Sequence, residues 1–99
     1  MANIIVDKTF RFAQEIITVY LDLREKGHYK IADQLVKSGT SIGANVEEAQ
    51  AAHSKLDFIA KLTISDKEAR ETRYWLRLLD KKEFLSLFKI RNTRNNSPA

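Results

Sequence analysis

Three arginines recur at helical spacing in the second half of the chain, and the planar guanidinium group binds phosphate well. Arg70, Arg73 and Arg77 are three and four residues apart, so a helix would place them on one face. Glu71 and Asp80 flank them, and salt bridges to an acidic neighbouring helix are the alternative use of this face. The spacing predicts a phosphate-binding ridge.

The net charge is concentrated at the end of the chain. The protein has 99 residues and a formal net charge of +4. Residues 1–80 carry equal numbers of basic and acidic side chains, so the excess arises from residues 81–99. There Lys89, Arg91 and Arg94 extend the predicted nucleic-acid-binding set. A solubilising charged tail is the alternative interpretation.

Residues suited to catalysis or metal binding are sparse. The absence of cysteine excludes disulfides, zinc–thiolate sites and a cysteine nucleophile. The two histidines, His28 and His53, are expected at opposite ends of one helix, and neither Glu47 nor Glu48 begins the Glu-x-x-His motif of di-metal bundles. We therefore predict no catalytic residue, no metal site and no cofactor.

A degraded or atypical helical ribonuclease is the alternative function. Arg91-Asn92 resembles the start of the arginine-to-histidine motif of HEPN-type ribonucleases, in which both side chains flank the scissile phosphate. No histidine follows His53, so the motif is incomplete here. A non-enzymatic protein is the favoured interpretation.

Three long helices and one short helix are expected to carry these residues. Apolar residues recur every three or four positions over about 8–26, 29–52 and 55–80, and more briefly over 82–91. Asp7 and Ser54 are suited to helix N-caps, and Gly27 to the position after a helix end. With Gly 3 and Pro 1 in the whole chain, this pattern predicts an all-α fold.

Small and polar residues interrupt the apolar pattern of the second predicted helix. Gly39 and Gly43 share a helix face, where another backbone could approach closely. We predict a helix-packing or subunit seam, with a helix break at 39–41 as the alternative. Asn45 and Glu48 would fix its register by hydrogen bonding or, alternatively, line an oligomer channel. The predicted seam consists of Ser38, Gly39, Ile42, Gly43, Asn45 and Glu48.

The first predicted helix is apolar on two sides. One stripe contains Phe10, Ala13, Ile17 and Tyr20, and the other contains Phe12, Ile16, Val19 and Leu23. So wide an apolar face predicts contacts on more than one side of the helix, as in a homo-oligomer. Four aromatic rings could stack on bases: Tyr74, Trp75, Phe84 and Phe88. Of these, Trp75 and Phe84 are expected in the core, with base stacking as the alternative role.

Three segments, at 41–49, 55–62 and 69–76, together with Phe10-x-Phe12-Ala13, resemble the four helix bundle protein family. This family is also called the 23S ribosomal RNA intervening-sequence protein family, and the resemblance covers about residues 5–85. It implies an antiparallel up-down four-helix bundle that assembles into a ring, typically a pentamer. No biochemical activity is established for the family. A more distant relative is a pentameric accessory protein of diversity-generating retroelements, which has a basic surface.

The resemblance and the residues together predict one helical bundle domain at 5–91 with a short fourth helix, followed by a polar basic tail at 92–99. We expect a non-enzymatic homo-oligomeric scaffold that binds RNA, DNA or a nucleic-acid enzyme through its basic surface. No segment is apolar and long enough to span a membrane, so the expected location is the cytoplasm.

Overall fold

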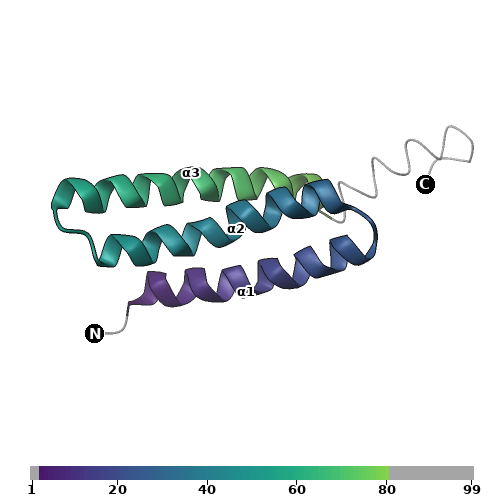
Figure 1. Cartoon of the computed structure of the whole chain (residues 1–99), viewed down its shortest axis with the longest axis horizontal. Helices are drawn as coiled ribbons and strands as arrows, with labels where there is room; N and C mark the ends of the chain where they lie inside the picture. The colour runs from purple at the N-terminus through teal and green to yellow at the C-terminus, as the bar shows by residue number, and fades with distance from the viewer. Residues whose placement is uncertain (1–2, 81–99) are drawn as a thin grey trace, which may run out of the picture.

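A computed structural model of the protein describes residues 3–80, which form three α-helices (Figure 1). The helices are α1 (Ile4–Glu25), α2 (Tyr29–Gln50) and α3 (Lys55–Leu79). Successive helices run antiparallel and are joined by short connections at 26–28 and 51–54. The central helix, α2, packs against both neighbours, whereas the Cα atoms of α1 and α3 stay more than 8 Å apart.

The predicted four-helix bundle is wrong, because the described chain is all-α with three helices. The fourth helix expected at 82–91 lies outside the described residues, as do the expected domain end at 91 and the tail at 92–99. That expectation depended on the family resemblance and on a segment with one short apolar stripe. Isolated helices need about 12–15 residues even in favourable sequences, so a ten-residue pattern is weak support for a helix.

Capping residues explain where the helices begin and end. Asn3 caps α1, with its side-chain oxygen accepting a backbone N–H at 3.3 Å, so the expected cap at Asp7 is wrong. Asp7 instead lies in the first turn, where the helix dipole favours negative charge. Gly27 follows α1 with φ of +86°, and the Ser54 hydroxyl accepts the Asp57 N–H at 3.0 Å, as predicted.

The core lies where α1 and α3 meet the inner side of α2. Its buried centre is formed by Ile16 and Leu23 of α1 and by Ala32 and Leu35 of α2. Half-buried side chains surround this centre: Phe12, Val19, Tyr20, Val36, Trp75, Leu76 and Leu79. The second apolar stripe predicted for the first helix therefore faces the core.

The glycines of α2 allow α1 to approach closely. The helix is continuous through 39–41, so the alternative of a break there is wrong. A Cβ atom on Gly39 would lie 2.8 Å from Cγ2 of Ile16, and one on Gly43 would lie 3.2 Å from the backbone oxygen of Thr9. Both glycines thus face α1 of the same chain.

Hydroxyl groups form hydrogen bonds between α2 and α3. The hydroxyl oxygens of Thr72 and Ser38 are 2.9 Å apart, and the Ser65 hydroxyl donates to the Ile42 carbonyl at 2.9 Å. Small polar side chains let the two helices pack closely while every buried side-chain N or O atom in the described part keeps a hydrogen-bond partner.

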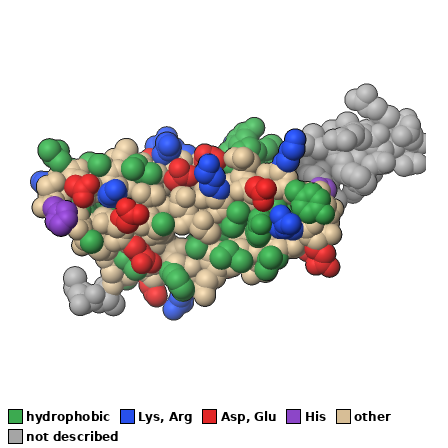
Figure 2. Space-filling view, viewed as in Figure 1, with side chains coloured by type: hydrophobic (Ala, Val, Ile, Leu, Met, Phe, Trp, Pro, Cys, Tyr) green, Lys and Arg blue, Asp and Glu red, His purple; other side chains and the backbone are tan. Residues whose placement is uncertain are grey.

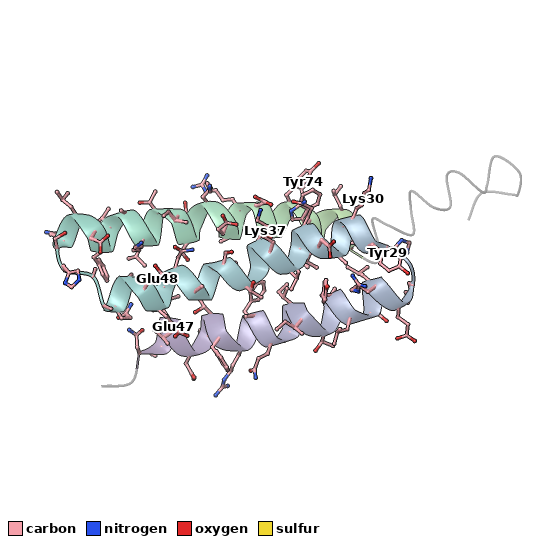
Figure 3. All side chains as sticks on the ribbon, in the orientation of Figure 1. Tyr29, Lys30, Lys37, Glu47, Glu48 and Tyr74 are labelled. Carbon is pink, nitrogen blue, oxygen red and sulfur yellow. The ribbon has the colours of Figure 1, made fainter. Side chains whose placement is uncertain are left out.

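Asn45 and Glu48, the polar residues of the predicted seam, differ in whether they contact a neighbouring helix. The Asn45 side-chain amide donates to the Ser41 carbonyl of its own helix at 2.8 Å. Glu48 lies on the side of α2 toward α3 (Figure 3) and forms a salt bridge of 3.3 Å with the half-buried Lys61. Only Glu48 therefore contributes a contact between helices.

Candidate nucleic-acid interface

The three predicted arginines share one face of α3. This helix runs without interruption for 25 residues from its Ser54 cap, so the three-and-four spacing of Arg70, Arg73 and Arg77 becomes a single ridge. Together with Tyr74 they line a shallow surface hollow of about 130 Å³. All four side chains are exposed to solvent. We call these four residues the arginine ridge.

The guanidinium groups of the ridge are only partly neutralised. Arg70 Nε lies 3.1 Å from Asp66 Oδ2, but both side chains are highly exposed, at 81% and 64%. Such surface pairs contribute little stability, so a phosphate could replace the carboxylate. Arg73 and Arg77 form no salt bridge with any other residue in the 3–80 range. Among the described residues, Arg73 and Arg77 thus have no acidic partner.

The two neighbouring aromatic residues of α3 have different environments. Trp75 packs against the core, and its Nε1 donates to Glu71 Oε2 at 3.1 Å, which confirms its predicted core position. Tyr74 remains 54% exposed and projects from the outer side of α3 (Figure 3). Phe84, the other residue expected in the core, lies outside the described residues. The sequence offers Tyr74 as a ring that could stack on bases, but Tyr74 is not part of the predicted nucleic-acid-binding set, although it follows Arg70 by one helical turn.

A second, larger hollow adjoins the ridge. It has a volume of about 360 Å³, and its apolar floor is formed mainly by Phe12 of α1, Ile42 of α2 and Leu76 of α3. Arg73 and Arg77 line this groove as well as the shallow hollow. These two arginines therefore border both an apolar groove and an aromatic surface.

One exposed flank of α1 carries large apolar side chains. Phe10, Ile17 and Leu21 are exposed by 55%, 43% and 59%, and their spacing places them on one stripe. Tyr20, which the sequence assigned to this stripe, packs against the core instead and lies under the Arg24 guanidinium at 5.7 Å from the ring centre. Leu21 takes its place. We call Phe10, Ile17 and Leu21 the outer stripe.

Other predicted site residues are not brought into the ridge. Lys89, Arg91 and Arg94 lie outside the described residues. Elsewhere basic and acidic side chains alternate over the visible face (Figure 2). Within residues 3–80, no three histidine or acidic side chains are grouped so that they could hold a metal ion. No helix in that range has the length and hydropathy needed to cross a membrane.

Comparison with known proteins places this fold in a family. A crystal structure of a protein of unknown function from the S23 ribosomal protein family of Bacteroides thetaiotaomicron superposes with a TM-score of 0.76 at 42% sequence identity. The alignment covers 94% of this chain and 87% of that protein. The curated proteins contain no significant match. The family model described as 23S rRNA-intervening sequence protein matches residues 1–97, which confirms the resemblance seen in the sequence. The chain therefore belongs to the 23S rRNA-intervening sequence protein family.

Proposed function

We propose that this protein is a non-enzymatic, homo-oligomeric helical scaffold that binds nucleic acid through the arginine ridge of α3. The observation that carries the proposal is that four residues line one hollow: Arg70, Arg73, Tyr74 and Arg77. Two of them, Arg73 and Arg77, form no salt bridge with residues 3–80, whereas Arg70 is paired with Asp66. Arginine forks bind phosphate oxygens in a bidentate manner. The family name refers to 23S rRNA, so RNA is the first nucleic acid to test.

The ridge is suited to binding rather than to catalysis. Its four side chains supply positive charge and one aromatic ring, but none of them is a histidine or a carboxylate that could move a proton near neutral pH. Of the carboxylates near it, Asp66 is exposed and paired with Arg70, Glu71 accepts from Trp75 Nε1, and Asp80 lines the adjoining groove. We therefore propose a scaffold, and we place it in the cytoplasm as the sequence predicted.

The outer stripe supports self-association. Three large apolar side chains on one helix face cost free energy when they remain in water, at about 25 cal/mol per Å² of apolar surface. Packing the outer stripe against another copy of the chain would remove this surface from water. We propose a homo-oligomer, with the pentamer implied by the family resemblance as the expected stoichiometry.

The binding proposal is tested by titrating a labelled RNA with the protein at several salt concentrations. Each phosphate contact contributes a slope of about −0.7 to −0.9 in log K against log salt, so Arg73→Ala combined with Arg77→Ala should weaken binding and flatten the slope by about 1.5. Lys8→Ala is the matched control, because Lys8 is exposed near the opposite end of the bundle.

Two results would contradict the binding proposal. One is the absence of any salt-dependent binding at low ionic strength. The other is that the double arginine variant binds RNA as tightly as the unaltered protein, or that Lys8→Ala weakens binding at least as much as the double arginine variant does.

The assembly proposal is tested by light scattering coupled to gel filtration at low and high salt. A pentamer of this chain has a mass of five times 11.4 kDa. Because the outer stripe is apolar, the mass should persist at high salt. A mass of one chain at micromolar concentration would contradict self-association.

A further inference from the structure

We infer that Tyr74 is a base-stacking platform and that the arginine ridge accordingly takes single-stranded nucleic acid rather than duplex. This inference rests on the proposed nucleic-acid binding and specifies which form of nucleic acid is bound. The juxtaposition that carries it is one exposed aromatic ring beside three arginines, all four lining a single surface hollow.

The position of Tyr74 on the helix brings phosphate ligands to both sides of its ring. Arg70 precedes it by four residues, Arg73 by one, and Arg77 follows it by three. Arg70 and Arg77, four and three residues away, are close neighbours of Tyr74 on the helix surface, and Arg73 lines the same hollow. A nucleotide stacked on the ring would therefore have its flanking phosphates within reach of guanidinium groups.

The ring of Tyr74 is held in place but not covered. It contacts Trp75 in a T-shaped arrangement, with ring centroids 5.2 Å apart and planes at 67°. Trp75 is itself fixed by core packing and by its hydrogen bond to Glu71. A T-shaped contact occupies at most one ring face, and the residue is 54% exposed. One face of a pre-oriented ring thus stays open to a base.

Unpaired bases are required for such stacking. In a duplex the bases are stacked on each other and only their edges and the backbone are accessible, whereas single strands present base faces to aromatic side chains. A ridge that bound duplex through phosphates alone would make no use of an exposed tyrosine among its arginines. The observed composition of the hollow thus favours a single strand.

Tyr29 is a second exposed tyrosine, and its ring has a different environment. Tyr29 is also 54% exposed, but the Arg24 guanidinium lies 5.2 Å from its ring centre. Its face is therefore used within the chain. Tyr29 provides a control of equal exposure and different environment.

The test compares three labelled probes by fluorescence anisotropy: oligouridylate, an abasic ribose–phosphate oligomer of equal length, and duplex RNA with the same number of phosphates. Stacking should make oligouridylate bind about 5- to 150-fold more tightly than the abasic oligomer. Tyr74→Leu should remove this difference without changing the affinity for the abasic oligomer or the duplex. Tyr74→Phe should preserve it, and Tyr29→Leu should have no effect.

The outcomes separate this inference from the proposed function. If no probe binds at low salt, the proposed nucleic-acid binding fails. If all three probes bind but the abasic oligomer binds as tightly as oligouridylate, or Tyr74→Leu leaves the difference intact, binding stands and the stacking platform is overturned. Far-ultraviolet circular dichroism and the urea unfolding midpoint show whether the Tyr74→Leu variant keeps its fold.

Discussion

Thr72 of α3 and Ser38 of α2 meet across the interface of these helices, with their hydroxyl oxygens 2.9 Å apart. Both residues are almost fully buried, at 1% and 0% exposure. The Thr72 hydroxyl also lies 2.7 Å from the Glu68 carbonyl, and the Ser38 hydroxyl lies 3.4 Å from the Leu35 carbonyl. This contact anchors the part of α3 that displays the arginine ridge.

Removing one hydroxyl of this pair should destabilise the protein. Thr72→Val keeps the shape of the side chain but leaves Ser38 with only its long contact to a carbonyl, so we expect the free energy of unfolding to fall by about 1–3 kcal/mol. Thr63→Val is the control, because the Thr63 hydroxyl bonds only its own helix at 2.8 Å on an exposed surface. Urea unfolding at one fixed protein concentration measures both.

The same pair allows a test of coupling. Ser38→Ala combined with Thr72→Val removes both partners, so the double variant should lose less stability than the two single losses together, by about 0.5 kcal/mol or more. Strict additivity of the two losses would show that the hydroxyls do not interact in solution.

The sequence predicted the long helices well because each carries a clear signal at its ends or along its face. The Ser54 cap and the positive φ of Gly27 follow from local chemistry. The start of the first helix did not follow, because Asn3 and Asp7 are equally good caps and only tertiary contacts choose between them. Asn3 donates to Gln50 of α2 at 2.7 Å, a contact that no local pattern contains.

The candidate site was only partly predictable for a related reason. Helical periodicity placed the three arginines together, since one helix determines their spacing. It also favoured a core position for Trp75, which is confirmed, but it did not decide whether Tyr74 would be exposed, because that depends on where α2 lies relative to α3. It also could not assign the two apolar stripes of the first helix to the core and to the surface, because both have similar composition.

The glycines facing α1 should tolerate no large side chain. Gly39→Leu would push against Ile16, which is buried, so we expect a loss of about 1–3 kcal/mol in the free energy of unfolding despite the better helix propensity of leucine. Ala44→Leu is the control, because Ala44 is exposed on the same helix. An unchanged melting temperature for Gly39→Leu would contradict the close packing of α1 on α2.

The outer stripe should be sensitive to charge if it is a subunit contact. Ile17→Glu places a carboxylate at the middle of the stripe, where burial would cost several kcal/mol, so the assembly should dissociate to smaller species. Thr18→Glu adds the same charge one residue away on a different side of α1 and should leave the mass unchanged. Sedimentation or light scattering distinguishes them, and equal masses for both variants would argue against the outer stripe.

Freeing Arg70 from its carboxylate partner should strengthen nucleic-acid binding. Asp66→Asn removes a negative charge 3.1 Å from Arg70 Nε, so one more guanidinium becomes available and the salt slope should steepen by up to about 0.9. Asp22→Asn is a matched control, because Asp22 forms a similar exposed pair of 2.9 Å with Lys26, four residues on at the C-cap of α1. If the two variants change RNA affinity equally, the effect is one of net charge, and the ridge is not where the phosphates bind.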